Sequence, residues 1–397
     1  MKKIAFIDTC FTGSTLPLIH RLTGSGIQVD LYEMASDHII KEEAFTFEEI
    51  PCRRGIGDVP AKYYSHMAEY LAPDMFRFRY ISMLRPFASV PILRSAVRIY
   101  RTACLRRLAR RLNEERYDLV NFISQYWDED YVPLIENIAC PKLVSIHEVC
   151  NHYDPDFSHT PYLLQTVFAK KIPVIVFSDK SREDILRYKD ISPDTVHTMR
   201  FGRFESYKYM YRDRPLDIGS DYFLFFGYMK PYKGADIFAK AIEIILGQRD
   251  DIRFVIAGKG HDDHVTRVAA HPNVSFINQF IENDDLVYLL QHSYAVVCPY
   301  RTASQSGIPQ TTFVFNKPII ASSLGSFKEI IGDDLFGLLT EPESPEALAT
   351  AIIRLWEDRS LYMRLTDNIA NFEDISQEYS WRNITQQYIQ IARSCQN

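Results

Sequence analysis

The stretch YFLFFGYMKPYKGADIFAKAIEIIL, residues 222–246, has the order of a buried strand, a polar loop and an amphipathic helix. Its first five residues are all apolar, which is typical of a strand that is covered on both faces of a sheet. Further on, Ile237, Ala241 and Ile244 recur at helical spacing and predict a helix with one apolar face. A strand followed directly by such a helix is the repeating unit of a parallel sheet.

The same alternation extends outward in both directions. Downstream, the expected strands are FVIAG, VSFIN, AVVCPY, PIIAS and FGLLT, with helical patterns between them. Upstream, KIAFID, a Thr-Gly-Ser turn, the helix-like LPLIHRLTGSG and IQVDLYE form a βαβ unit, and the strands RYDLVNFIS, KLVSIHE and PVIVFSD follow. The pattern predicts an α/β fold of two doubly wound, Rossmann-like domains that face each other across a cleft, where ligands bind beyond the carboxyl ends of the strands.

A domain boundary is expected where the chain turns polar and aromatic, between Glu205 and Asp221. We therefore expect a first domain over residues 1–205, a second over 206–375 and a C-terminal helix over 376–397.

Composition limits the classes of function. The chain has 397 residues, of which 46% are apolar and 24% charged, as in a soluble globular protein. Its net charge of −6 argues against nucleic acid as a partner. It contains no apolar run of the ~18 residues that a membrane span needs, and its N-terminus lacks the features of a signal peptide. Its seven cysteines form no CxxC pair, which favours a reducing, cytoplasmic location without disulfides or a structural metal.

The segment TASQSGIPQTTFVFN, residues 302–316, forms a corner at the end of the strand AVVCPY. Pro309 suits the first turn of a helix, because the N–H that it lacks would be unpaired there. Free backbone N–H groups and the helix dipole at such a start favour an anion such as a phosphate. Gly307 would let a ligand approach the backbone closely. The alternative is an ordinary strand-to-helix turn.

Two further loops are expected at the same edge of the second sheet. In GYMKPYKG, residues 227–234, Lys233 stands before Gly234 and adds a positive charge to an anion site. The alternative is a solvated surface lysine. In LGSFKEII, residues 324–331, Glu329 either accepts a ligand hydroxyl or caps its own helix.

The order FFGxxxxYKG, AGKG, SGIP…NKPIIAS and LGSFKEIIGDDLFGLL resembles the donor domain of retaining glycosyltransferases of family 4, which have the GT-B fold. The resemblance spans roughly residues 221–360. It extends to the first domain, where SIHEVCNH is similar to an HDxxxH stretch of some members. It also reaches SWRNITQQYIQIA, with Trp381, which resembles the last helix that crosses back to the first domain.

The resemblance implies an enzyme that moves a sugar, with retention, from a nucleotide-sugar donor to a glycan or a lipid-linked acceptor in polysaccharide or glycolipid synthesis. It implies no metal and no cofactor, because a lysine and a helix start replace them at the diphosphate. Lys233 matches the lysine that holds the diphosphate, and His147 matches the histidine beside the donor sugar. The backbone at Ser306 and Gly307 matches the phosphate-binding helix start. Glu148 and His152 complete the histidine stretch. The other implied donor-binding positions are Gly13, Gly227, Tyr228, Lys230, Gly258, Arg301, Ser304, Ile308, Thr312 and Glu329.

The sequence departs from the family pattern at two places. Tyr228 stands where many members have an arginine, for which Lys230 or Arg301 are candidate substitutes. Ser304 and Thr312 stand where members have a pair of glutamates. These departures leave two alternatives, a catalytically inactive relative that binds a nucleotide sugar and a GT-B nucleotide-sugar epimerase.

Three other segments have a plain structural interpretation beside a functional one. WDED, residues 127–130, resembles the DxD of metal-dependent enzymes, but a solvated helix start is favoured. HDDH, residues 261–264, is typical of an acidic helix N-terminus. The arginine-rich segment 91–115 favours packing within its domain with a basic outer edge. A peripheral contact with anionic lipid at the inner membrane face is the alternative, to which the aromatic-basic run MFRFRY, residues 75–80, would contribute.

Overall fold

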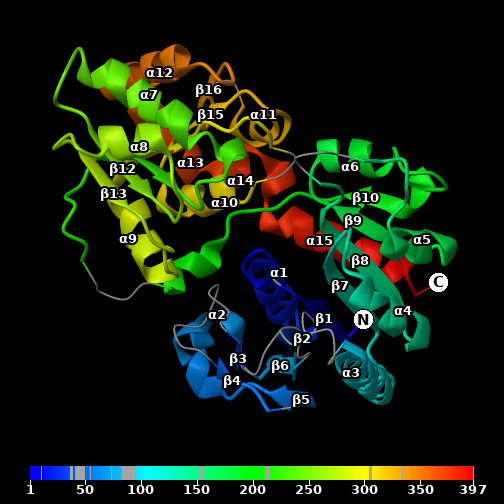
Figure 1. Cartoon of the computed structure of the whole chain (residues 1–397). Coiled ribbons are helices and arrows are strands. Elements are labelled where there is room, and N and C mark those ends of the chain that lie inside the picture. The colour runs from blue at the N-terminus through cyan, green and yellow to red at the C-terminus, as the bar shows by residue number, and fades with distance from the viewer. Residues whose placement is uncertain are drawn as a thin grey trace. The chain divides into compact units, whose positions relative to one another are not determined.

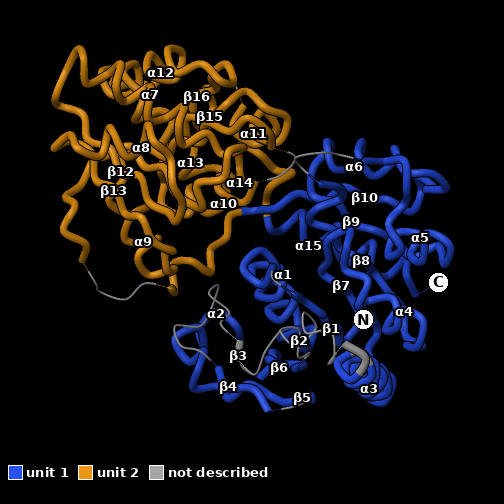
Figure 2. Tube along the Cα trace, in the orientation of Figure 1, with its two compact units in different colours: residues 1–202, 381–397 blue, residues 203–380 orange. Residues whose placement is uncertain are grey.

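The computed structural model describes residues 1–9, 11–35, 39–40, 50–53, 55–72, 74–82, 94–151, 156–210, 215–303, 306–332 and 334–396. The chain divides into two compact units, of which unit 1 is residues 1–202 with 381–397 and unit 2 is residues 203–380 (Figure 2). Each unit contains its own largely parallel sheet with helices packed on it (Figure 1). The predicted α/β fold with two Rossmann-like domains is therefore confirmed, while the cleft between the domains stays a prediction.

Unit 2 has a six-stranded sheet in which every pair of neighbours is parallel. In spatial order the strands are β13 (Val274–Ile277), β12 (Arg253–Ala257), β11 (Tyr222–Phe226), β14 (Ser293–Cys298), β15 (Ile319–Ser322) and β16 (Gly337–Thr340). The chain runs outward from β11 to one edge, then returns to β14 and runs to the other edge. This order is that of the doubly wound dinucleotide-binding fold, and its switch point lies between β11 and β14.

Successive residues of the central strands of unit 2 enter two different cores. Phe223 and Phe225 of β11 lie in the core that α7, α8 and α12 cover. Tyr222 and Leu224 of the same strand lie in the opposite core, with α9 and α11. Burial on both faces explains why these strands are continuously apolar in sequence. The helices of unit 2 are α7 (Ala235–Leu246), α8 (Asp263–Val268), α9 (Asn283–His292), α10 (Ile308–Thr312), α11 (Gly325–Ile331), α12 (Pro345–Glu357), α13 (Arg359–Ala370) and α14 (Phe372–Ile375).

Unit 1 has an eight-stranded sheet that is parallel except for its last strand, which pairs antiparallel with its neighbour. In spatial order the strands are β10 (Val196–Thr198), β9 (Val174–Val176), β8 (Lys142–Glu148), β7 (Leu119–Gln125), β1 (Lys3–Asp8), β2 (Gln28–Ala35), β6 (Phe76–Ser82) and β5 (Gly55–Asp58). A separate antiparallel pair is formed by β3 (Ile39–Ile40) and β4 (Ile50–Pro51).

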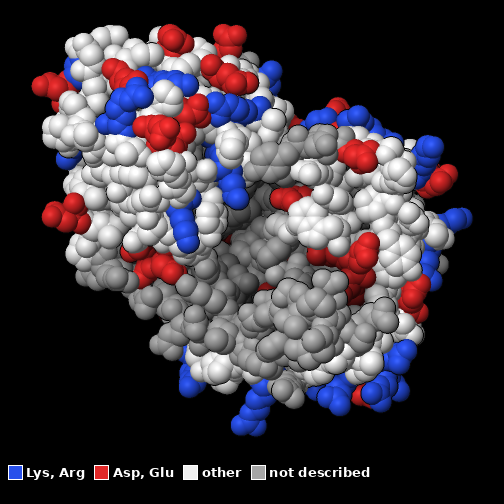
Figure 3. Space-filling view, in the orientation of Figure 1, with Lys and Arg blue, Asp and Glu red and all other residues white. Residues whose placement is uncertain are grey.

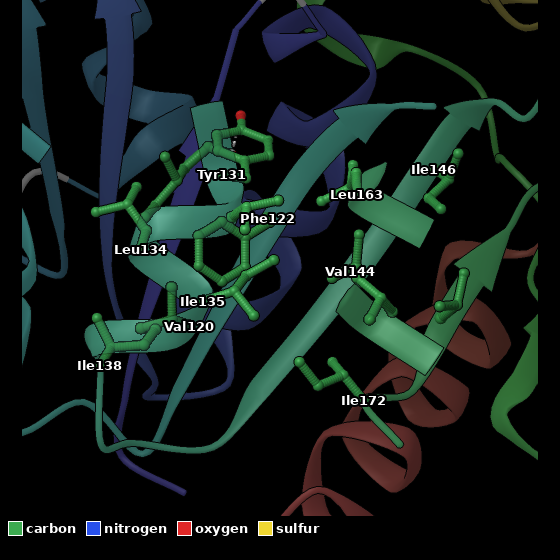
Figure 4. Close-up of a cluster of buried hydrophobic side chains, with 14 of the residues drawn as sticks. Val120, Phe122, Tyr131, Leu134, Ile135, Ile138, Val144, Ile146, Leu163 and Ile172 are labelled. Atoms are coloured by element: carbon green, nitrogen blue, oxygen red, sulfur yellow. Dashed lines mark hydrogen bonds between the residues drawn. The ribbon is translucent and has the colours of Figure 1, made fainter. Parts of the chain in front are cut away.

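One face of this sheet packs against helices that follow β6, β7 and β8 in sequence. Val120 and Phe122 of β7 meet Leu134 and Ile135 of α4 in a fully buried cluster (Figure 4). The helices of unit 1 are α1 (Thr12–Gly24), α2 (Ala68–Leu71), α3 (Arg94–Glu114), α4 (Val132–Asn137), α5 (Tyr162–Ala169), α6 (Asp179–Ile185) and α15 (Trp381–Ser394). No helix of the described segments is both long and apolar enough to cross a membrane.

The C-terminal helix α15 belongs to unit 1, as expected for a helix that returns to the first domain. The ring of Tyr388 stacks on Phe6 of β1 with 5.9 Å between centroids. The Tyr388 hydroxyl accepts a hydrogen bond of 3.2 Å from Asn121 Nδ2. Trp381, at the start of α15, is 1% exposed. These buried contacts fasten the last helix to the first sheet.

Two local expectations for unit 1 are wrong. The Thr-Gly-Ser segment is not a turn before a helix, because α1 already begins at Thr12 and includes Gly13 and Pro17. The run MFRFRY is not a surface segment, because it forms the interior strand β6, with Phe76 and Phe78 buried. Its arginines are held by carboxylates. Arg77 Nε and Nη2 donate to Asp30 at 2.7 and 2.8 Å. Most of this run is therefore buried, and the side chain of Arg77 remains partly exposed.

Candidate functional site

The candidate site of unit 2 lies at the carboxyl ends of β11 and β14, where the strand order of the sheet reverses. The loop after β11 comprises residues 227–234, and the loop after β14 runs from Pro299 to Gly307. Open parallel sheets bind their ligands at such a switch point, because the two loops diverge there. The sheet thus brings together two of the loops that the sequence indicated.

Backbone contacts that only glycine permits position Lys233 at the switch point. Gly234 has a φ of +69°, and a Cβ on it would lie 2.0 Å from the carbonyl oxygen of Pro299. The loop after β11 therefore packs directly on the start of the loop after β14. Gly227 has a φ of +112°, and a Cβ there would lie 2.6 Å from Lys233 Nζ. The ammonium group of Lys233 thus lies over the end of β11.

Lys233 has no counter-ion among the described residues of unit 2. Burial lowers the pKa of its ammonium group, and Cys298 is the only titratable neighbour among the described residues that opposes this shift. The Cys298 thiol is itself fully buried, and its pKa is raised to about 12. Lys233 Nζ also lies 5.7 Å from the centroid of the Tyr300 ring. A desolvated cation without a carboxylate partner favours the binding of an anion.

A third loop, after β12, interlocks with the loop that holds Lys233. Gly227 N donates to Ala257 O at 2.9 Å, and Met229 N donates to Lys259 O at 3.1 Å. Gly258 has a φ of +155°, and a Cβ on it would lie 1.9 Å from Gly227 O. Gly258 therefore permits the close approach of the two loops. This packing is a reason for glycine at 258 in addition to the predicted contact with the donor.

In addition to the partly buried Lys233, the interlocked loops carry two exposed lysines and one exposed aromatic ring. Lys230 and Lys259 are exposed, and neither forms an ion pair with any residue that the structure describes. Tyr228 is 48% exposed, and the centroid of its ring lies 6.0 Å from that of Phe280. The edge of unit 2 thus presents positive charge beside an accessible aromatic surface.

Arg301, a candidate substitute for the missing arginine, is already engaged by protein groups. Its Nη1 and Nη2 donate to the two carboxylate oxygens of Asp236 at 2.9 and 2.8 Å. Nη1 also donates to Pro231 O at 2.6 Å, and Nε donates to Glu343 at 3.3 Å. Arg301 N donates to Tyr232 O at 2.7 Å. These bonds brace the loop of Lys233, so the guanidinium supports this loop as a structural clamp.

The corner after β14 begins a helix that is shorter than predicted. Helix α10 covers only Ile308–Thr312, and a 3-10 turn, η9 (Phe313–Phe315), continues it. Tyr300 is buried, and the side chain of Ser306, at the start of the corner, lies near its hydroxyl. The side chain of Tyr300 is therefore close both to Lys233 and to the corner.

Gly307 is exposed and has a φ of −83°, a value that any residue adopts. A Cβ on Gly307 would lie 2.9 Å from Cε2 of Phe204, a side chain that is 6% exposed. Phe204 is tied to the same corner, because its N–H donates to Gln310 O at 3.1 Å. The packing of Phe204 is thus a reason for glycine that the sequence did not indicate.

The remaining unit 2 positions differ in their surroundings. Ile308 begins α10 and is partly buried, whereas Thr312 is 0% exposed and its hydroxyl finds no partner among the described groups. Glu329 lies on α11 and is partly buried. Ser304 lies outside the described residues.

His147 lies in the interior of unit 1, near the end of β8. It is 5% exposed, and its ring stacks on Phe11 at 3.9 Å and on Phe201 at 5.3 Å between centroids. Burial lowers its pKa to about 3, so the imidazole is neutral at physiological pH. Nε2 has no hydrogen-bond partner among the described groups, and the ring lines a small apolar cavity with Phe177 and Trp381.

The other predicted site residues of unit 1 are Glu148, Gly13 and His152. Glu148 ends β8 and is partly buried, and its carbonyl accepts from Tyr126 N at 2.9 Å. Gly13 is the second residue of α1. His152 lies outside the described residues.

The two acidic motifs have structural roles. In WDED, Asp128 accepts from Gln125 N at 2.8 Å, and Asp130 forms an ion pair with Arg101. In HDDH, Asp262 caps α8 by accepting from His264 N and Val265 N. Within the described residues no group of three or more His, Cys, Asp or Glu side chains could hold a metal ion.

The sequence did not indicate that Tyr300, Asp236 and Phe204 belong to this site. Tyr300 could have been found, because it ends the strand segment AVVCPY next to the corner. The Asp236–Arg301 clamp joins residues 65 positions apart and leaves no local signal.

Two Rossmann-like units, the second with loops gathered at the switch point of its sheet, are the arrangement of the GT-B fold. Residues 220–358 match the family model Glycosyl transferases group 1.

Two of the relatives that this chain resembles in sequence are named glycosyltransferases of microorganisms. The chain is 25% identical over 173 residues to an uncharacterised glycosyltransferase of Methanocaldococcus jannaschii, covering 42% of this chain and 43% of the relative. It is 35% identical over 149 residues to the D-rhamnosyltransferase WbpZ of Pseudomonas aeruginosa, covering 35% and 37%. The chain thus matches less than half of the length of these curated relatives.

Whole-chain likeness is seen in solved structures. HepE of Anabaena in complex with UDP and glucose superposes with a TM-score of 0.67 at 16% identity, covering 99% of this chain and 100% of that one. At this identity the likeness shows the fold alone.

Proposed function

We propose that this chain is a retaining, metal-independent glycosyltransferase that moves a sugar from a nucleotide-sugar donor to a glycan or lipid-linked acceptor. The observation that carries the proposal is the ammonium group of Lys233, which is desolvated and lacks a carboxylate partner in the described part of unit 2. A nucleotide diphosphate is an anion whose charge complements such a cation. The Glycosyl transferases group 1 domain at residues 220–358 supports the same reaction class.

The proposed chemistry uses charge stabilisation. The bond between the anomeric carbon and the diphosphate oxygen breaks, and negative charge builds on the leaving diphosphate. Lys233, the backbone N–H groups at Ser306 and Gly307, and the exposed Lys230 and Lys259 would stabilise that charge. The acceptor oxygen forms the new bond on the same face of the sugar, and its proton passes to the leaving phosphate. This route needs no carboxylate nucleophile and no metal.

The resemblance to family 4 assigns His147 to the donor sugar. A neutral imidazole both donates and accepts a hydrogen bond, and Nε2 of His147 has no partner among the described residues. Its low pKa, about 3, favours hydrogen bonding to a sugar hydroxyl over proton transfer.

The test is a panel of nucleotides and nucleotide sugars that includes UDP-glucose, GDP-mannose and dTDP-rhamnose. A cognate donor at about 100 times its Kd should stabilise the folded chain by about 2.7 kcal/mol, which thermal unfolding detects. Mass spectrometry should then show transfer of the selected sugar to an added glycan or lipid-linked acceptor. NMR of the isolated product should show that the anomeric configuration of the donor is retained.

Each contrary outcome identifies one alternative. Stabilisation without transfer or hydrolysis would favour an inactive nucleotide-sugar-binding relative. Conversion of the donor to an epimer without an acceptor would favour an epimerase. An inverted product would contradict retention while leaving the transferase assignment intact.

The role of metal is tested separately. We expect turnover to persist in excess EDTA, because Lys233 and the loop N–H groups supply the positive charge that a metal would otherwise supply. Initial rates with EDTA, with Mg²⁺ and with Mn²⁺ should agree within about twofold, well below the effect of losing a key transition-state contact. Loss of activity in EDTA that Mg²⁺ or Mn²⁺ restores would refute metal independence.

A further inference from the structure

Helix α3 of unit 1 presents an exposed basic face, of which Arg107 also lies beside Gly55 of β5. Leu105, Leu108 and Leu112 point to the core and are buried. The opposite face of the helix is exposed, and helical spacing of 100° per residue places its members within about a third of a turn. The members of this α3 face are Ile99, Ala103, Arg106, Arg107, Arg110 and Glu114.

The arginines of the α3 face are uncompensated. Arg106, Arg107 and Arg110 form no ion pair with any described residue, whereas other arginines of the same helix do. Arg101 is paired with Asp130, and Arg111 with Glu115. Figure 3 shows Lys and Arg side chains gathered at the lower right, over the place of α3 in Figure 1. The whole chain has a net charge of −6, so this concentration of positive charge is local.

Ile99 distinguishes the α3 face from a purely electrostatic one. It is 70% exposed, and it lies two helical turns before Arg106 on the same side of α3. A free polyanion would contact arginines and gain nothing from an exposed isoleucine. An anionic bilayer surface offers headgroup phosphates to arginines and acyl chains to an apolar side chain.

We propose that the α3 face binds the surface of a bilayer that contains anionic phospholipid. The binding is peripheral, with α3 lying along the surface. It adds an interaction to the proposed sugar transfer and is measured without any turnover, so either proposal can fail alone.

The experiment uses the full chain with two kinds of vesicle. One contains phosphatidylcholine alone, and the other also contains about a third phosphatidylglycerol as the anionic lipid. Co-sedimentation should require phosphatidylglycerol and weaken as salt rises, because screening shortens the reach of the arginines. The variant Arg106→Glu/Arg107→Glu/Arg110→Glu should lose on the order of 10²-fold in affinity, at about fivefold per arginine near an anionic surface. Ile99→Asp should weaken binding with the arginines intact.

A matched control changes the same charge elsewhere in unit 1. Lys170, Lys171 and Lys189 are exposed and form no ion pair with the described residues, so Lys170→Glu/Lys171→Glu/Lys189→Glu should bind vesicles within a few-fold of the unchanged chain. Circular dichroism and thermal unfolding verify that each variant folds. If the glutamate variant fails to fold, Arg106→Gln/Arg107→Gln/Arg110→Gln replaces it. This variant should also lose affinity for vesicles with phosphatidylglycerol, by a smaller factor.

Three outcomes would overturn the proposal. They are equal binding to phosphatidylcholine alone, vesicle binding by a folded arginine variant at the level of the unchanged chain, and an equal loss in the lysine control. Binding to heparin or poly(U) through the same arginines, without binding to vesicles, would assign the face to a soluble polyanion instead.

Discussion

Replacing Lys233 with alanine is expected to lower the turnover number by about 10²-fold or more, the loss typical of a main transition-state stabiliser. The ammonium group lies over the end of β11, and a buried thiol is the one described group that opposes the lowering of its pKa. Charge on the leaving diphosphate is greater in the transition state than in the bound donor. The loss should therefore fall more on kcat than on KM.

The fold should survive this substitution, because alanine removes a desolvated charge that no carboxylate balances. Lys189→Ala, at an exposed lysine of unit 1, is a matched control and should turn over at the unchanged rate. The two variants are compared by initial rates with the donor selected by the panel and by thermal unfolding. A folded Lys233→Ala protein with unchanged kcat would exclude Lys233 from the site.

The strands were predictable where burial on both faces makes them continuously apolar. The segment KLVSIHE coincides with β8, and YFLFFG extends one residue beyond β11. The strand β6 was missed because Arg77 and Arg79 interrupt its apolar residues. Arg77 is held by Asp30, which comes from a neighbouring strand 47 residues before it, and the buried Arg79 is held by Asp30, Asp58 and Glu115. Such tertiary compensation leaves no periodic pattern in the sequence.

The candidate site was predictable to the level of its loops. Gly227, Gly234 and Gly258 mark positions where a positive φ and close backbone contacts require glycine, and such positions leave a visible signal. Which cations are free for a ligand was not predictable. Lys233 and Arg301 are both loop cations in sequence, but only Arg301 is fixed by Asp236, a residue that lies far from it along the chain. The fold distinguishes the two.

Gly307 is the position where the sequence suggested one reason for glycine and the structure adds another. Gly307→Val should reduce affinity for the selected nucleotide sugar about tenfold or more, about 1.4 kcal/mol, because a side chain would cover the backbone N–H groups of the corner. It should also lower the free energy of unfolding by about 1–3 kcal/mol, the usual result of overpacking. The cause is Phe204, which a Cβ at 307 would approach to 2.9 Å. The φ of −83° adds no strain.

The two effects separate in a background where Phe204 is smaller. Phe204→Leu provides room beside position 307, so Gly307→Val in that background should cost little further stability. Donor affinity, measured by calorimetry on Phe204→Leu and on the double variant, should still differ by about tenfold, because the N–H groups remain covered. Equal affinities in these two proteins would mean that the glycine serves only the packing of Phe204. The diphosphate would then be held by Lys233 and the loops around Gly227 and Gly258, without the start of α10.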